Sequence, residues 1–298
     1  MVADVFGAMT YHRPVLAREA VEALITDPNG VYVDATYGGG GHSRLILSRL
    51  GEKGRLIATD QDPEAPFSDI EDARFTAVRA NFRHLMALLE SLGVKAIQGL
   101  LVDLGVSSHQ LDTPERGFSY RAEGPLDLRM DPTKGLPAYE WLRRQSEESL
   151  TRILREYGDL PRAHRLAQAL LHRSPQTTLE LRAVVEAIYG PQALTYMAQT
   201  FQALRIALND EMSALEELLR AATEVTLPYG RLVGLTYHSG EARRIKALYQ
   251  TPLRIEPLYG HRHYAWKLLH KQRPSSEEIQ ENPRSRSATL WILEKLPL

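Results

Sequence analysis

The chain has 298 residues, contains no cysteine and carries a formal net charge of −1 at pH 7. The lack of cysteine excludes disulfides, thiolate metal sites, iron–sulfur clusters and a cysteine nucleophile, and we expect no bound metal. No apolar run approaches the length of a membrane-spanning helix and no signal-peptide pattern opens the chain, so we expect a cytoplasmic protein without a membrane partner.

A strand, a run of four glycines and a helix follow one another early in the chain. After a loose terminus over residues 1–10 and a helix over 17–25, alternating apolar residues predict a strand over 31–35. Gly38 to Gly41 come next, and apolar residues at helical spacing predict a helix from Ser43 to Leu50. Glycine lets a ligand approach the backbone, and a helix N-terminus offers N–H groups and partial positive charge. We therefore expect a polar or anionic ligand at this join, although a tight turn without a ligand also explains glycines.

Three further strands are predicted over residues 55–60, 74–79 and 97–103, with a helix over 84–92. Strands that alternate with helices imply an α/β fold whose parallel sheet is covered on both faces. The side chains at the carboxyl ends of such strands share one edge of the sheet, so Asp60, Phe82 and Asp103 are expected to cluster there. Asp60 also stands about 20 residues after the glycines, where α/β nucleotide folds place a carboxylate for ribose hydroxyls.

The alternation of strands and helices stops after Asp103. Residues 105–135 are rich in Gly, Pro, Ser and Asp, residues 138–219 read as helical, and a strand pattern returns over 230–237. These patterns predict an all-helical insert over residues 107–210, which interrupts an α/β domain formed by residues 1–106 and 211–298. Residues 264–269 and 288–293 are expected to form a closing antiparallel hairpin, with a polar, mobile segment over 273–287 between them.

The glycine run does not fit the G-x-G-x-x-G pattern of nicotinamide dehydrogenases. The reading frames that start at Gly38 and Gly39 place Ser43 and Arg44 at the last position. The acid that ends the fourth strand and the C-terminal hairpin favour an S-adenosylmethionine methyltransferase, with a nicotinamide oxidoreductase as the alternative enzyme. In the favoured interpretation the glycines face the methionine part of the donor, and Asp60 binds the ribose hydroxyls. Phe82 either packs beside the adenine or belongs to the core.

A series of motifs in chain order matches the pattern of one family. They are His12-x-Pro-Val-Leu16, Asp34-Ala-Thr-x-Gly-Gly-Gly-Gly-His-Ser43, Asp60-x-Asp-Pro63, Leu101-x-Asp-Leu-Gly-Val-Ser-Ser108, Glu115-Arg-Gly-Phe-Ser119, Gly124-Pro-Leu-Asp-x-Arg-Met-Asp131, Thr200-Phe-Gln-Ala-x-Arg-Ile206, Asn209-x-Glu211, His238-Ser239 and Asn282-Pro-Arg-Ser-Arg-Ser287. In these motifs the chain resembles the bacterial 16S ribosomal RNA (cytosine-N4) methyltransferases of the MraW type, nearly from end to end.

The resemblance implies a Rossmann-like methyltransferase domain, a helical substrate domain and S-adenosyl-L-methionine as methyl donor. The implied target is the exocyclic amine of a cytosine in the decoding region of 16S ribosomal RNA, within the small ribosomal subunit. By the family pattern the cofactor contacts fall on Gly40, Gly41, His42, Asp60, Phe82, Asp103 and Gln110. Two departures stand out: His109 replaces the usual proline, and Ala242 replaces an acid in His238-Ser-Gly-Glu-Ala-Arg243. The second departure puts any role of that acid in doubt.

The cytosine amine is a poor nucleophile because its lone pair is delocalised into the ring, so a hydrogen-bond acceptor near the amine helps the reaction. Without a cysteine, methylation at nitrogen or oxygen is favoured over methylation at C5 of a pyrimidine. The Pro-Pro tetrad that is common in amino-methyltransferases is missing after the fourth strand. The candidate catalytic residues are Asp103, Ser107 with its neighbour Ser108, and His238. Asp103 as a residue that only binds cofactor and His238 as a structural histidine remain the alternatives.

Clusters of cations are the expected contacts with RNA. They are Arg143, Arg144, Arg152, Arg155, Arg162, Arg165 and Arg173 of the insert, Arg254, Arg262, Lys267, Lys271 and Arg273 further along the chain, and Arg284 and Arg286. Each of these is also explained as an ordinary solvated surface charge. A non-catalytic RNA-binding factor of ribosome assembly is the third class of function, and the oligomeric state stays open, a homodimer included.

Overall fold

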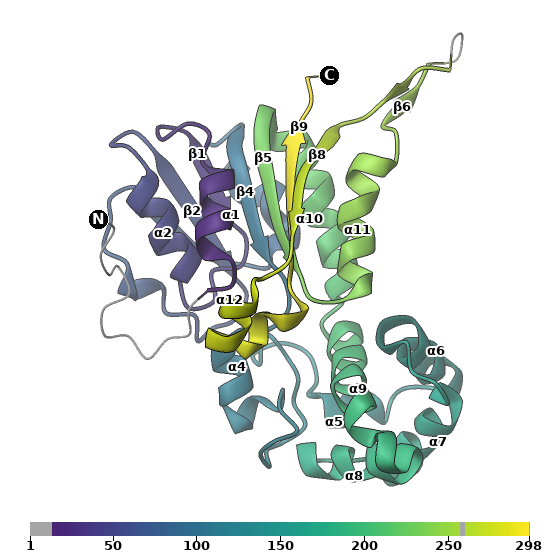
Figure 1. Ribbon diagram of the computed structural model, residues 1–298. Helices are drawn as coiled ribbons and strands as arrows, with labels where there is room; N and C mark the ends of the chain where they lie inside the picture. The colour runs from purple at the N-terminus through teal and green to yellow at the C-terminus, as the bar shows by residue number, and fades with distance from the viewer. Residues whose placement is uncertain (1–13, 257–259, 298) are drawn as a thin grey trace.

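The computed structural model describes residues 14–256 and 260–297, and its centre is a seven-stranded sheet (Figure 1). Its strands are β1 (Val31–Asp34), β2 (Arg55–Asp60), β3 (Phe75–Arg79), β4 (Ile97–Asp103), β5 (Thr226–Thr236), β8 (Trp266–Gln272) and β9 (Thr289–Lys295). They lie in the order β3-β2-β1-β4-β5-β9-β8. The first five strands pair in parallel, whereas β9 runs antiparallel to both β5 and β8. The predicted pairing of the last two strands is therefore confirmed.

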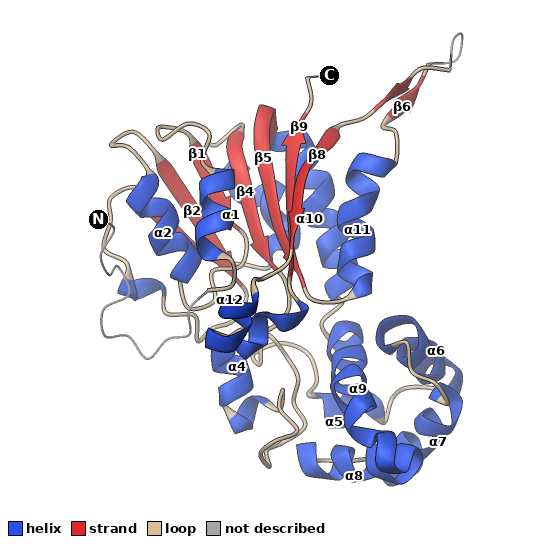
Figure 2. Cartoon of the chain, viewed as in Figure 1, coloured by secondary structure: helices blue, strands red, loops and turns tan. Residues whose placement is uncertain are grey.

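Helices cover both faces of the sheet, as predicted for an α/β fold (Figure 2). One face carries α1 (Ala17–Leu24) and α2 (Gly41–Arg49), and the other carries α3 (Leu85–Ser91), α10 (Glu211–Val225) and α11 (Ser239–Gln250). Successive residues of β4 alternate between the two apolar cores: Leu100 and Val102 belong to one, and Leu101 belongs to the other. This double burial explains why the strand is almost continuously apolar.

The helical insert has an apolar core of its own. It contains α4 (Ser108–Asp112), α5 (Ala138–Leu142), α6 (Glu147–Gly158), α7 (Ala163–Arg173), α8 (Thr178–Tyr189) and α9 (Ala193–Leu208). Its buried cluster runs from Phe118 to Leu204, whereas Leu215 and Leu218 of α10 pack against the sheet. We propose residues 107–210 as the limits of the insert on this ground. Figure 1 shows the insert beyond the sheet edge at which α4 and α11 begin.

Residues 273–287, expected to be mobile, instead fold into α12 (Ser276–Glu281) and the 3₁₀ helix η5 (Pro283–Ser287). The Ser275 side chain caps α12 by accepting a hydrogen bond from Glu278 N at 3.1 Å, and Glu278 Oε1 accepts one from Leu16 N at 2.7 Å. Ser285 is fully buried. The segment is therefore helical in the structure, and its polar composition conceals these caps in the sequence. The expected loose terminus over residues 1–10 lies outside the described residues.

The remaining elements are short. They are the 3₁₀ helices η1 (Phe67–Asp69), η2 (Phe82–His84), η3 (Pro114–Arg116) and η4 (Gly190–Gln192), and the two strands β6 (Arg254–Ile255) and β7 (Arg262–His263). β6 and β7 form a hairpin arm that projects from the end of the sheet opposite the insert (Figure 1). In the described part of the chain, no helix combines the length and the apolar character that a membrane span requires.

Candidate active site

A cavity of about 840 Å³ lies at the carboxyl ends of the parallel strands, where the strand order reverses between β1 and β4. Open α/β sheets bind their ligands at this switch point. The loops after β1, β2, β3, β4 and β5 line one side, and α9 with the start of α10 lines the side toward the insert. Of the predicted site residues, these line the cavity: Gly41, His42, Asp60, Phe82, Asp103, Ser107, Gln110 and His238. Gly40 does not line it.

The glycine run forms a tight turn between β1 and α2. Gly38 and Gly40 have positive φ angles of 54° and 77°. A Cβ at Gly40 would lie 2.6 Å from the Tyr37 hydroxyl, so only glycine fits there. The helix then begins at Gly41, two residues before the predicted start, and among the described residues no side chain caps it. The turn thus presents a helix N-terminus to the cavity, which suits an anionic group.

Asp60 is held by two backbone N–H groups at the end of β2. Its Oδ2 accepts a hydrogen bond from Gly38 N at 2.8 Å, and its Oδ1 accepts one from Asp62 N at 2.9 Å. Burial raises the pKa of the Asp60 carboxyl to about 6, against these two hydrogen bonds, which lower it. A carboxylate has about four lone-pair sites, so Asp60 keeps sites for two further donors. The pattern suits the pair of hydroxyls on a ribose.

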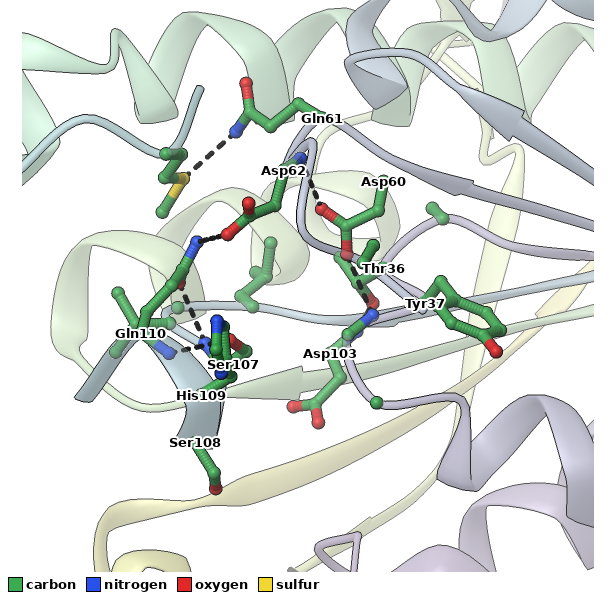
Figure 3. Close-up of a pocket in the computed structure, with 18 of the residues that line it drawn as sticks. Thr36, Tyr37, Asp60, Gln61, Asp62, Asp103, Ser107, Ser108, His109 and Gln110 are labelled. Atoms are coloured by element: carbon green, nitrogen blue, oxygen red, sulfur yellow. Dashed lines mark hydrogen bonds between the residues drawn. The ribbon is translucent and has the colours of Figure 1, made fainter. Parts of the chain in front are cut away.

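Asp103 ends β4 on the same edge of the sheet, with Thr36 between it and Asp60 (Figure 3). Its backbone N–H donates to Thr36 Oγ1 at 2.6 Å, which fixes its position beside the glycine turn. Its Oδ1 accepts a hydrogen bond from the Tyr237 hydroxyl at 2.8 Å, and its Oδ2 lies 3.9 Å from His42 Nδ1. Burial raises the pKa of Asp103 to about 6. At neutral pH most of this carboxyl is therefore an ionised acceptor.

His42 connects Asp103 to the segment before α1. Its Nε2 lies 3.1 Å from the Val15 carbonyl, which requires a proton on that nitrogen. In the neutral ring Nδ1 is then unprotonated, and it is the nitrogen on the Asp103 side. The ring is only 5% exposed, so its contact with the cavity is confined to one edge.

Ser107 and Gln110 form a capping box at the start of α4. Ser107 Oγ accepts from Gln110 N at 3.2 Å, and Gln110 Oε1 accepts from Ser107 N at 3.0 Å. Gln110 Nε2 donates to Asp62 Oδ2 at 2.7 Å. Figure 3 shows this chain of contacts running from Ser107 through Gln110 and Asp62 to Asp60. Both ends of the Gln110 amide are thus engaged by protein atoms.

His238 caps the next helix, α11. Its Nδ1 accepts from Gly240 N at 3.1 Å, which places the ring proton on Nε2. Nε2 lies 3.1 Å from Glu241 Oε1, but the approach lacks hydrogen-bond geometry and Nε2 has no hydrogen-bond partner among the described residues. Glu241 Oε2 accepts from the backbone of Tyr237 at 2.6 Å and of His238 at 3.2 Å. The capping contacts support the structural alternative for His238, whose Nε2 atom is buried.

Several charged or hydroxylic residues at the cavity had no predicted role. Tyr237 and Asp62 line it, as do Arg205 and Glu211, which form a pair through Nε to Oε1 at 2.7 Å and Nη2 to Oε2 at 2.9 Å. Arg116 contacts Asp62 from the insert. All of these residues except Tyr237 belong to the motifs quoted above, and membership of a motif was the one sequence feature that could have indicated a role for them. Their partners are distant in sequence, so the motifs alone did not reveal the contacts.

A family model and two curated relatives each match nearly the whole chain. The model of the MraW methylase family matches residues 9–296. The ribosomal RNA small subunit methyltransferase H of Bacteroides thetaiotaomicron is 43% identical, covering 96% of this chain and 98% of that protein. Its namesake in Burkholderia thailandensis is 44% identical, covering 97% and 99%. A solved rRNA methylase from Streptococcus thermophilus aligns over 97% of this chain and 100% of its own, with 11% identity and a TM-score of 0.43.

Proposed function

The chain belongs to the MraW methylase family, and we propose that it methylates the N4 amine of a cytosine in the decoding region of 16S ribosomal RNA. S-adenosylmethionine is the methyl donor, and the small ribosomal subunit carries the substrate. The observation that supports this proposal best is the pair of half-buried carboxylates, Asp60 and Asp103, on either side of Thr36 in one cavity.

The residues present fit this donor. It carries a sulfonium, an ammonium and a carboxylate, and it supplies an electrophilic methyl group when bound. Asp103 provides negative charge near the cations, and Asp60 provides acceptors for the ribose hydroxyls. The uncapped N-terminus of α2 provides N–H groups for the carboxylate. Phe82 lines the cavity and also packs against the sheet core, so the two predicted roles of this residue are compatible.

We assign donor contacts to the residues of the family pattern. Asp60 takes the ribose hydroxyls with the lone pairs that Gly38 and Asp62 leave unused. Gly41 and His42 bring the first turn of α2 to the cavity wall. Gly40 contributes through the shape of the turn, and Gln110 contributes by holding Asp62, to which its Nε2 donates.

Asp103 is the candidate that best orients the target amine. Tyr237 takes one lone pair of Oδ1, and we assign Oδ2, on the His42 side, as the acceptor for an N–H group of the base. An acceptor there localises the lone pair of the amine and receives its proton during or after transfer. Ser107 and His238 are weaker candidates because each already serves as the N-cap of a helix. Beyond this hydrogen bond, the protein contributes to methyl transfer by aligning the amine with the methyl group and by excluding water from the site.

Asp103→Ala separates the two roles that this residue can have. A residue that orients the amine should be needed for transfer even when donor is saturating, so we expect the single-turnover rate to fall by about 100-fold or more. Donor affinity is measured separately by calorimetry with S-adenosylhomocysteine. If affinity falls while the single-turnover rate at saturating donor stays normal, Asp103 only binds the cofactor.

The proposed RNA contacts lie in three different places. The insert arginines are exposed on or beside α5, α6 and α7, which do not line the cavity, whereas Arg284 lines the cavity and donates to Asp112 of α4 at 3.1 Å. Arg254 and Arg262 lie on the β6–β7 arm, at the opposite end of the sheet (Figure 1). We propose that the first two groups bind RNA near the target base and that the arm reaches a more distant segment. Phosphate contacts of this kind make affinity fall as salt rises.

A methyl-transfer assay tests the function as a whole. Labelled donor is incubated with purified small ribosomal subunits, and the product nucleoside is mapped by mass spectrometry. We expect N4-methylcytidine at one position of the decoding region. Transfer to another nucleoside would refute the assignment of the target, and the absence of transfer would favour a non-catalytic RNA-binding factor. Thermal stabilisation by NAD but not by S-adenosylmethionine would instead indicate an oxidoreductase.

A further inference from the structure

Arg116, at the start of the insert, is buried against the loop that follows β2. Its Nη1 donates to Asp62 Oδ1 at 3.1 Å, to Asp62 Oδ2 at 2.8 Å and to Glu64 Oε2 at 2.8 Å. Arg116 and Asp62 are each 5% exposed. Gln110 Nε2 also donates to Asp62 Oδ2. We call Asp62, Glu64, Gln110 and Arg116 the clamp residues.

On one side the clamp acts on a donor-binding group. Asp62 N donates to Asp60 Oδ1, so the Asp62 backbone, together with Gly38 N, fixes the orientation of the Asp60 carboxylate. The Asp62 side chain, in turn, is positioned by Arg116 and Gln110. Two hydrogen bonds therefore link the Arg116 guanidinium to the Asp60 carboxylate: one from Arg116 to Asp62 and one from Asp62 to Asp60.

On the other side the clamp acts on the insert. Arg116 Nη2 donates to the carbonyls of Arg129 at 3.2 Å and Met130 at 3.1 Å. Met130 N donates to Asn209 Oδ1 at 2.8 Å, and Asn209 Nδ2 donates to the Leu128 carbonyl at 2.8 Å. Asn209 follows α9, so the loop that Arg116 contacts is fixed to the end of the longest helix of the insert.

A buried ion pair is weak support for stability, because desolvating both charges offsets much of their attraction. Such a pair instead favours one relative position of its two side chains, because separating them leaves a buried charge without its partner. Here the pair joins two parts of the molecule that bind different things: the β2 loop binds the donor, and the insert faces the RNA. His109, which replaces the family's proline, adds an outer contact to Glu64 at 2.9 Å.

We infer that Arg116 is a positioning residue for donor binding: acting through Asp62, it holds Asp60 in its binding orientation and couples donor affinity to the placement of the helical insert. The inference rests on the proposed function for the identity of the donor. A preorganised loop binds its ligand more tightly because less ordering accompanies binding. Coupling between two sites is reciprocal, so bound donor must also steady the insert loop over residues 127–131.

The test compares Arg116→Lys with wild type in the full-length protein. Lysine keeps the charge but cannot reach two carboxylates and two carbonyls from a planar fork. We expect affinity for S-adenosylhomocysteine, measured by calorimetry, to fall at least about tenfold, the effect of losing roughly one charge-assisted hydrogen bond. We expect KM for the donor to rise while the single-turnover rate at saturating donor stays within about twofold of wild type.

Arg74→Lys is the matched control. Arg74 forms a similar but more exposed pair with Asp72, through Nε at 2.9 Å and Nη2 at 2.6 Å, and it also donates to the Leu50 carbonyl at 2.7 Å. Neither Arg74 nor Asp72 lines the cavity. We expect donor affinity in this variant to match that of wild type.

Hydrogen exchange provides a readout that a merely structural role would not change. Bound S-adenosylhomocysteine should slow exchange over residues 127–131 in wild type and in Arg74→Lys, but not in Arg116→Lys. If Arg116→Lys does not fold, the nearly isosteric variant Asp62→Asn takes its place in the same measurements, and we expect the same results. Equal affinity and equal protection in the clamp variant and the control would overturn the inference. Failure of wild type to bind S-adenosylhomocysteine would instead overturn the proposed function.

Discussion

Replacing Tyr237 by Phe removes one hydroxyl and leaves the shape of the side chain unchanged. That hydroxyl donates to Asp103 Oδ1 at 2.8 Å and lowers the pKa of the carboxyl, which burial alone would raise beyond about 6. A hydrogen bond to a charged group contributes about 1.5–3 kcal/mol. Since one pKa unit corresponds to about 1.4 kcal/mol, we expect the pKa of Asp103 in Tyr237→Phe to rise by about 1–2 units.

The consequence for catalysis is a shift along the pH axis. At pH 7 the ionised fraction of Asp103 should fall from about nine-tenths to between about one-half and one-tenth. If the ionised form accepts the amine proton, the rate at neutral pH falls by roughly the same factor and recovers near pH 9. The acid limb of the profile therefore moves up by about 1–2 units at an unchanged plateau.

The assay is single-turnover methyl transfer at saturating donor, from about pH 5 to about pH 9. Saturating donor matters because Asp60 also has a pKa raised to about 6 by burial, and its protonation would act through donor affinity. Tyr189→Phe is the control, since its hydroxyl donates to the Pro161 carbonyl at 2.6 Å within the insert. An acid limb that does not move would show that Asp103 is not the titrating group. A lower plateau would show that Tyr237 does more than tune Asp103.

Two further predictions concern the donor half of the site. Gly40→Ala combines a positive φ angle of 77° with a Cβ 2.6 Å from the Tyr37 hydroxyl, whereas Gly93→Ala has a φ of 67° and no atom within 4 Å. Thermal unfolding should therefore show a loss about 1–2 kcal/mol larger for Gly40→Ala, and only this variant should bind S-adenosylhomocysteine more weakly. Affinity for S-adenosylhomocysteine should also fall as pH drops through about 6, because Asp60 takes up a proton there. Titration calorimetry that finds the same affinity at pH 5 and pH 7.5 would contradict this assignment.

The sequence alone determined the architecture of the α/β domain. Apolar periodicity is local, so the strands over 55–60 and 97–103 and the helical character of the insert were predictable within a residue or two. The carboxyl ends of parallel strands lie at one edge of the sheet, and this rule was enough to predict that Asp60 and Asp103 lie close together. Glycine also permits the positive φ angles found at Gly38 and Gly40, but the sequence did not predict which of the four glycines would adopt them.

Only the tertiary structure decided which groups those carboxylates meet. Tyr237 and Asp103 are 134 positions apart, and Arg116 and Asp62 are 54 apart. His238 is a helix cap as well as a cavity residue, and residues 273–287 fold because Ser275 and Glu278 find partners. Periodicity tells which side chains are buried, but a buried polar group can be satisfied by any donor or acceptor that packing brings within reach. The choice among them depends on how the insert lies against the sheet, and no local pattern carries that information.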